Sequence, residues 1–297
     1  MATLDSRTGL LKYGFIGPAL VLLIALNIFP LIYNVGLSFT DASGIGRETS
    51  FVGLHNYARV LAEPEYVSGM RITAIFVAAA VSAELLLGFV LALALRDRFA
   101  GRSAVLTILL IPMMLSPAVM GLFWHQILKE DYGVLNQLLA VVGLGEPQWT
   151  ADPRLKLVSV LIIDIWMWTP FMMLIALAGL NSIPRYIYEA AEIDRAGRWR
   201  VFWKITLPMS APLLVLAVLL RTTDALKQFD LVMAIAGRNE ASTKTLSVLL
   251  YEQLICYQKI GLGSAYACVV LVLVIALATI FTRYIDFIQR KQGRLEA

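Results

Sequence analysis

The stretch EAAEIDRAGRWRVFWKITLP, residues 189–208, is charged and basic, yet it lies between two long apolar runs. Its charge density excludes a membrane span here, whereas both flanking runs are apolar enough to form one. Short segments rich in Lys and Arg stay on the cytoplasmic side of a membrane, so the stretch predicts a cytoplasmic loop between two spans. The basic residues within or beside it are Arg185, Arg195, Arg198, Arg200 and Lys204.

The composition extends this interpretation to the whole chain. Of the 297 residues, 59% are hydrophobic and 15% are charged, whereas soluble domains average about 45–50% apolar and about 25% charged residues. A polytopic helical membrane protein is predicted. The net charge of +4 is small, and the basic residues flank apolar runs, so nucleic-acid binding is not indicated. Two cysteines and two distant histidines predict neither a disulfide framework nor a metal site.

Six apolar segments are long enough to cross a membrane, since a spanning helix needs about 20 residues. An all-α fold follows, because open sheet edges cannot be left unpaired in lipid. The first segment is longer than the core of a signal peptide, so we expect a retained span. Prolines at 18, 30, 112, 117 and 170 interrupt several segments and are compatible with packing or with hinges. The predicted spans are residues 13–39, 72–95, 103–128, 155–179, 210–235 and 264–288.

The distribution of Lys and Arg predicts the orientation of this bundle. With the N-terminus inside, the cytoplasmic parts hold fourteen basic residues and the outer loops hold nine. The tight loop RDRFAGR, residues 96–102, is the clearest single indication, with three arginines in seven residues. The sequence therefore predicts that both termini lie in the cytoplasm (N-in/C-in).

The basic stretch also carries a recognisable pattern. Glu189, Ala190 and Ala191 are followed at a fixed interval by Ile-x-Leu-Pro at residues 205–208. This pattern resembles the EAA loop of permease subunits of ATP-binding-cassette (ABC) importers, which forms a short coupling helix on the ATPase subunit. Arg195 stands where that family has glycine, and Arg disfavours the left-handed conformation that glycine permits. The resemblance implies a coupling helix at about 185–197 and ATPase-coupling roles for Glu189, Ala190, Ala191, Asp194, Arg195 and Gly197.

The resemblance extends over residues 10–288 and points to the sugar-type subgroup. Its further motifs are LLIPMMLSPAVMGLFW at 109–124, RTTDALKQFDLV at 221–232 and GLGSAYA at 261–267. It implies the fold of a type I ABC importer permease. Residues 1–70 would form an N-terminal segment with the first span and an interfacial helix in the outer loop. Residues 71–288 would form the core permease domain, and residues 289–297 a cytoplasmic tail.

The same resemblance implies function and partners. The chain would be the permease of an ATP-driven, binding-protein-dependent carbohydrate importer, a multi-pass protein of the bacterial inner membrane, surrounded by lipid. Its partners would be a second permease, two copies of an ATPase subunit and an extracytoplasmic binding protein. The chain has no G-x-x-x-x-G-K-[ST] motif, so we expect it to have no enzymatic activity or cofactor of its own. ATP and Mg²⁺ would be bound by the ATPase.

The fifth predicted span contains an unusual group of polar residues. Ionisable side chains at membrane depth are expensive, and they are usually paired or functional. Arg221 can pair with Asp224, and Asp224 with Lys227, each three positions apart. An ion-pair network at an interface and a polar wall of the translocation path both remain open. The candidate path residues are Arg221, Asp224, Gln228 and Asp230, with Trp124 and Trp168 as possible stacking surfaces for sugar rings.

Other interpretations remain open at this stage. Glu84 and Asp164 are isolated acids in the second and fourth predicted spans, for which hydrogen bonding within the bundle is expected. A permease of the same family could carry polyols or glycerol phosphates. An ion-coupled secondary transporter could use Asp224 or Glu84 as its proton carrier, but it leaves the 189–208 pattern unexplained. A membrane enzyme would need clustered acid–base or metal groups, which the sequence does not show.

Overall fold

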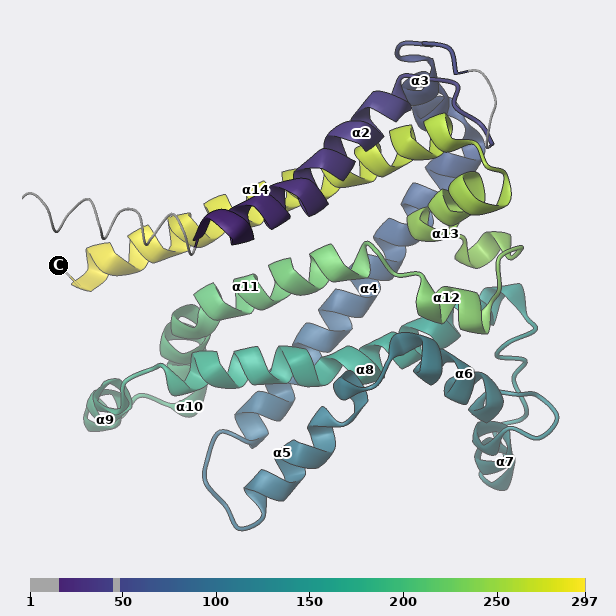
Figure 1. The fold of residues 1–297 in the computed structure, drawn as a ribbon. Helices are drawn as coiled ribbons and strands as arrows, with labels where there is room; N and C mark the ends of the chain where they lie inside the picture. Colours follow the sequence, from purple (N-terminus) through teal and green to yellow (C-terminus); the bar gives the residue numbers. More distant parts are fainter. Residues whose placement is uncertain (1–15, 45–48, 297) are drawn as a thin grey trace, which may run out of the picture. The chain divides into compact units, whose positions relative to one another are not determined.

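The computed structural model describes residues 16–44 and 49–296, with side chains described through residue 288. The described part is helical (Figure 1), with one isolated β-bridge between Thr40 and Phe51. Residues 13–15 of the predicted first span lie outside the described residues, as do residues 1–12 and Ala297. The prediction of an all-α membrane protein is confirmed. The α-helices are α2 (Phe29–Ser38), α3 (His55–Ala62), α4 (Pro64–Ala94), α5 (Arg102–Leu110), α6 (Pro117–Ile127), α7 (Val134–Val141), α8 (Pro153–Asn181), α9 (Arg185–Ile193), α10 (Arg198–Val201), α11 (Leu207–Ala225), α12 (Asp230–Ile235), α13 (Leu246–Tyr251) and α14 (Ile260–Glu296).

Five helices of the described part are long and apolar enough to cross a membrane. Two of them include π-helical turns or a shorter helix: η1 (Ile24–Ile28) precedes α2, and α10 and η3 (Phe202–Thr206) precede α11. The count of six spans and the N-in orientation remain predictions from the sequence. The five are Ile16–Ser38, Pro64–Ala94, Pro153–Asn181, Arg198–Ala225 and Ile260–Ile288.

The segment predicted as the third span, residues 103–128, is not one continuous helix. It forms α5, the short 3-10 helix η2 (Pro112–Met114) and then α6. Between η2 and α6 the backbone at Leu115 and Ser116 is extended. Pro117 explains the extended backbone at Ser116, because the residue before a proline is pushed out of the helical region. Pro112 contributes by lacking the N–H of one helical hydrogen bond, although Ile111 before it stays helical. Pro170 lies inside α8 without ending it.

The segment predicted as the fifth span is also displaced. Its long helix ends at Ala225, and α12 begins separately at Asp230. Four residues, 226–229, separate the two helices, and Phe229 there has a non-helical backbone. The end of the predicted span at 235 is therefore wrong by about three helical turns, and Asp230 does not belong to the long helix.

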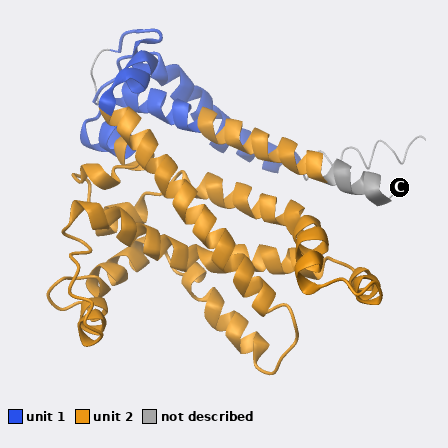
Figure 2. Ribbon diagram, turned by 180° about the vertical axis from the view of Figure 1, so that it is seen from behind, with its two compact units in different colours: residues 1–64, 250–271 blue, residues 65–249, 272–297 orange. Residues whose placement is uncertain are grey.

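The chain divides into two compact units, shown in Figure 2. The first comprises residues 1–64 and 250–271. Within it, the buried side chain of Asn56 on α3 donates to the carbonyl oxygens of Ser38 at 2.9 Å and Thr40 at 2.7 Å. Asn56 therefore fixes α3 to the end of α2. In the loop for which an interfacial helix was predicted, Phe51 and Leu54 precede α3 and are exposed.

The second unit, residues 65–249 and 272–297, holds the main core. Side chains from α4, α8, α11 and α12 meet there, including Phe76, Ile163, Ala217 and Leu231. Two separate connections of this unit contain α7 and the 3-10 helix η4 (Ala241–Thr243), and Lys156 on α8 forms an ion pair with Glu240 at 2.7 Å. The hydrogen bond from Lys156 holds the pKa of the Glu240 carboxyl below its ordinary value. The π-helical turn η5 (Glu252–Cys256) belongs to the first unit.

Candidate functional site

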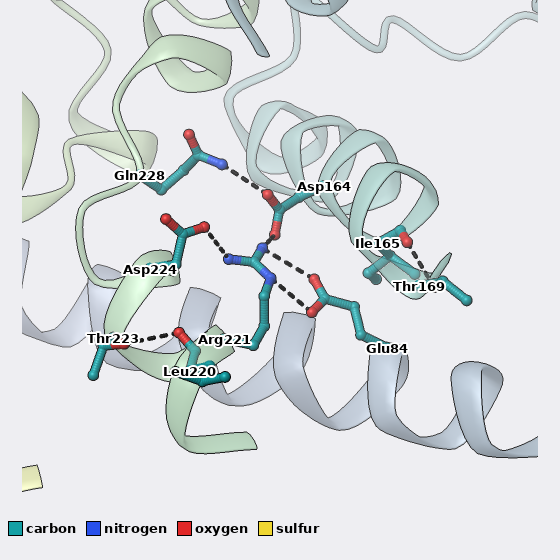
Figure 3. Close-up of polar contacts among 9 residues, drawn as sticks. All are labelled: Glu84, Asp164, Ile165, Thr169, Leu220, Arg221, Thr223, Asp224 and Gln228. Atoms are coloured by element: carbon teal, nitrogen blue, oxygen red, sulfur yellow. Dashed lines mark hydrogen bonds and ion pairs between the residues drawn. The ribbon is translucent and has the colours of Figure 1, made fainter. Parts of the chain in front are cut away.

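A buried arginine joins three helices at membrane depth. Arg221 on α11 is 1% exposed, and its guanidinium binds Glu84 on α4 through two hydrogen bonds, Nε to Oε2 at 2.8 Å and Nη2 to Oε1 at 3.1 Å. Nη2 also donates to Asp164 on α8, and Nη1 donates to Asp224 at 3.1 Å (Figure 3). Glu84 and Asp164 lie at least ten residues from either end of their helices, about 15 Å along the axis.

Further contacts orient this group. The second oxygen of Asp164 accepts a hydrogen bond from Nε2 of Gln228 at 2.7 Å, and Oε1 of Gln228 accepts from the backbone N–H of Phe229 at 3.0 Å. The Trp168 ring lies 4.9 Å from the guanidinium carbon of Arg221, a cation–π arrangement. We call Glu84, Asp164, Arg221, Asp224 and Gln228 the Arg221 cluster.

The Arg221 cluster is closed on one side and open on another. Glu84 and Asp164 have no exposed surface, whereas the Asp224 side chain is 55% exposed. One cation faces three carboxyl groups, so the cluster presents acceptor oxygens in excess of its donors. Such an arrangement can offer carboxylate and amide groups to a hydroxylated ligand from the side of Asp224 and Gln228, while Arg221 stays fixed behind them.

The structure brings together four of the six predicted path residues. Arg221, Asp224 and Gln228 belong to the cluster, and Trp168 stacks on it. Asp230 opens α12 and is exposed, outside the network. Trp124 packs edge-on against Trp166 with 5.5 Å between ring centroids, not against the guanidinium. The predicted pair of Asp224 with Arg221 is present, whereas among the described residues no ion pair joins Asp224 to Lys227.

Sequence reasoning missed two of the three acidic partners of Arg221. Glu84 and Asp164 were expected to make ordinary hydrogen bonds within the bundle, but both bind the guanidinium directly. A signal was available in the sequence. A cation within an apolar span requires counter-charges, and Glu84 and Asp164 are the acids within the neighbouring predicted spans.

The predicted coupling segment forms the helix α9 and a tight turn. The N–H of Ala196 bonds to the carbonyl of Ala191 at 2.9 Å, and the N–H of Arg195 bonds to that of Glu192 at 3.0 Å. These two bonds form a Schellman motif, which requires a left-handed residue after the helix. Arg195 is that residue, with φ of 52°. The turn therefore forms despite the substitution of the family's glycine, whereas Gly197 has an ordinary negative φ.

The coupling segment also presents an uncovered surface. Ala191 is buried, whereas Glu189, Ala190, Asp194, Arg195 and Gly197 are exposed. Ile193 is 83% exposed and Trp199 75% exposed. Between α9 and residues 196–205 lies a hollow of about 390 Å³, whose lining includes Tyr186, Ala190, Val201 and Ile205 as well as the charged Arg200 and Lys204. Exposed apolar side chains next to a hollow are typical of a surface that binds another protein.

Comparisons with known proteins identify the family of this chain. The model of the family described as "Binding-protein-dependent transport system inner membrane component" matches residues 84–292. The trehalose/maltose transport system permease protein MalF of Thermococcus litoralis is 34% identical over 94% of this chain and 95% of that relative. The trehalose transport system permease protein SugA of Mycobacterium tuberculosis is 32% identical over 94% of this chain and 91% of that relative.

A solved structure shows the same fold. A bacterial ABC transporter involved in the import of the acidic polysaccharide alginate matches with a TM-score of 0.82, covering 95% of this chain and 97% of that chain at 20% identity. The family match covers most of the chain, and both relatives exceed 30% identity over nearly its full length. The chain therefore belongs to the binding-protein-dependent inner membrane components, the permeases of ABC transport systems.

Proposed function

We propose that this chain is the permease subunit of an ATP-driven carbohydrate importer. The observation that carries the proposal is the near full-length similarity to permeases named for trehalose and maltose transport. The Arg221 cluster supports it chemically. Sugar hydroxyl groups bind carboxylate, amide and guanidinium groups, and all three occur here beside the aromatic ring of Trp168.

The transport path would run past the open side of the Arg221 cluster. Asp224 is half exposed and Gln228 is partly exposed, so both can reach a passing ligand. Arg221, Glu84 and Asp164 would serve as the rigid wall behind them, because all three are buried. Trp168 would contact the ligand beside the cluster, and Trp124 and Asp230 would contact it elsewhere along the route.

Coupling to ATP hydrolysis would pass through α9 and its turn. The surface made by Glu189, Ala190, Asp194 and Arg195 is exposed and lies beside the apolar hollow. The chain would pair with a second permease, stand on two ATPase subunits and receive its cargo from an extracytoplasmic binding protein. ATP and Mg²⁺ would be bound by the ATPase, because the sequence lacks the phosphate-binding loop.

Uptake of a labelled disaccharide tests this function. Cells that lack the chain should not take up radiolabelled trehalose or maltose, and the wild-type chain should restore uptake. Glu189→Lys reverses a charge on the exposed side of α9 and should abolish most of the uptake while the chain remains in the membrane. Asn239→Lys, at an exposed position of another loop, is the matched control.

The energy source separates this function from that of an ion-coupled transporter. Uptake should stop when cellular ATP is depleted and should persist under a protonophore while ATP is maintained. Uptake that collapses with the proton gradient at constant ATP would contradict the proposal, as would normal uptake by the Glu189→Lys variant.

A further inference from the structure

A polar hollow, separate from the Arg221 cluster and from the apolar hollow beside α9, lies where α4 ends and α5 begins. Its volume is about 470 Å³, and arginines dominate its lining. It is bordered on the other side by the last residues of α8 and the first residue of α9. The polar lining residues are Arg96, Asp97, Arg98, Arg102, Asn181 and Arg185.

The positive charge of this arginine hollow is not neutralised within the described part of the chain. Four arginines face a single acid, Asp97, and no ion pair joins any of the four to a described carboxylate. Other contacts fix two of them. Nε of Arg102 donates to the carbonyl of Leu95 at 2.7 Å, and the guanidinium of Arg96 stacks on the Tyr188 ring at 4.3 Å. Fixed arginines lose little further freedom when they bind an anion.

Backbone N–H groups at two helix starts add to the positive charge of the arginine hollow. α5 begins at Arg102 after Gly101, and α9 begins at Arg185 after Pro184. Neither helix has a side chain that caps its first N–H groups. The start of a helix carries partial positive charge and free N–H donors, which favour phosphate and other anions. The arginines and the two helix starts therefore both favour the binding of an anion in this hollow.

We propose that the arginine hollow binds the phosphate group of an anionic phospholipid headgroup. The hollow lies at the ends of two membrane-spanning helices, α4 and α8, where the apolar spans give way to polar residues. The buried side chains of Leu180 and Ile183 form its apolar side. In the predicted N-in orientation the hollow faces the cytoplasmic leaflet, whose anionic lipids attract basic pockets between spans. The site is independent of the transported cargo.

The position of the hollow links the lipid to the coupling segment. Arg96 contacts Tyr188 on α9, and Arg185 is the first residue of α9. A phosphate held between the 96–102 loop and Arg185 would brace the start of α9 against the end of α4. Lipid occupancy would therefore limit the mobility of the helix that is proposed to contact the ATPase.

Native mass spectrometry of the detergent-purified complex tests the proposal. The complex is mixed with phosphatidylglycerol or with zwitterionic phosphatidylcholine, and the retained lipid is counted. The wild type should retain phosphatidylglycerol selectively. R98Q/R185Q should bind it roughly thirtyfold more weakly, since it removes two cationic groups near the headgroup. R154Q/R238Q, with two exposed arginines of the predicted outer loops exchanged, is the matched control and should bind as the wild type does.

Further arms identify the ligand and control for folding. R98K/R185K keeps the charge and should retain most of the binding, which separates loss of the site from loss of the fold. Inorganic phosphate should not displace the lipid, and displacement would reassign the site to free phosphate. Equal retention by R98Q/R185Q and the wild type would overturn the proposal. If R98Q/R185Q retained the lipid normally but lost the ATPase subunit from the complex, the hollow would instead be a protein-docking surface.

Discussion

At the scale of single residues, Arg221 is the cation that pairs with the acidic side chains of the Arg221 cluster. Its guanidinium satisfies two carboxyl groups with no exposed surface, Glu84 and Asp164, and one that is half exposed, Asp224. Buried ion pairs contribute little net stability when intact, but removal of one partner leaves an uncompensated charge. The partners of Arg221 are therefore not equivalent, because only the two fully buried acids depend on it.

Arg221→Ala should strongly lower the unfolding temperature, because it leaves Glu84 and Asp164 buried without a cation. Breaking a buried pair costs about 3–5 kcal/mol. R221A/D224A should be no better, since Asp224 is already half exposed to solvent. Thermal unfolding of the detergent-purified protein measures both.

Two further variants complete this test. Asp224→Asn alone should unfold near the wild-type temperature, and Arg221→Met with Glu84→Gln and Asp164→Asn should regain stability lost in Arg221→Ala. Recovery of normal stability by R221A/D224A would show that Arg221 serves Asp224 alone and would contradict this assignment.

Arg195 stores strain in the turn after α9. A left-handed residue other than glycine costs roughly 1–2 kcal/mol, and Arg195 has φ of 52°. Arg195→Gly should relieve this strain and slow amide hydrogen exchange in the peptide that contains Ala196. Gly197→Ala is the control, because Gly197 has a negative φ and open space around it. Faster exchange at Ala196 in Arg195→Gly would contradict the interpretation of the turn.

At the scale of elements, α4 and α8 are in close contact at Gly88, one helical turn from Glu84 of the Arg221 cluster. A Cβ atom at Gly88 on α4 would lie 2.7 Å from Cβ of Met172 and 2.8 Å from the backbone nitrogen of Met173. Glycine thus permits a backbone contact one helical turn from Glu84. Small residues at such crossings are the usual means of close packing between spans.

Gly88→Ala should separate α4 from α8 and weaken the Arg221 cluster. Overpacking of this kind typically costs about 1–3 kcal/mol. The control is Gly36→Ala on α2, where an added Cβ meets nothing within 4 Å. The unfolding temperature of the Gly88 variant should fall clearly below that of the Gly36 variant, and equal temperatures would contradict the close approach.

The elements also show what the sequence could and could not predict. Apolar length located both ends of α8 and the end of α4, because about 20 apolar residues are needed to cross a bilayer. The first residues of α4, from Pro64, were not predicted to be part of that helix. It did not place the break at Pro112 and Pro117 or the end of α11 at Ala225, because hydropathy does not register backbone hydrogen bonding. The Glu-Ala-Ala pattern located α9 within a few residues. The contact of Arg221 with Glu84 and Asp164 depends on how helices distant in sequence pack, which one sequence does not encode locally.

At the scale of the whole molecule, the unequal distribution of basic residues predicts the side on which each loop lies. The loop of residues 96–102 and the coupling segment should be cytoplasmic, and the loop around Asn239 should be outside. Single cysteines at Arg98, Arg198 and Asn239 test this, in a background where Cys256, which is partly exposed, is replaced by Ser. An impermeant thiol reagent added to intact cells should label only position 239. Labelling of position 198 from outside would reject the N-in orientation.

The separation of Glu84 and Arg221 by 137 positions has a consequence for how the protein is made. Ribosomes add about 5–20 residues per second, so Glu84 is synthesised roughly 7–27 seconds before its cation. An ionisable residue at the centre of a span costs about 2.5–3.5 kcal/mol on insertion. Asp164, made 57 positions before Arg221, adds a second unmatched acid. We expect the insertion machinery to retain α4 and α8 beside the growing chain until α11 emerges, so that release into the lipid waits for the last of the three charged helices.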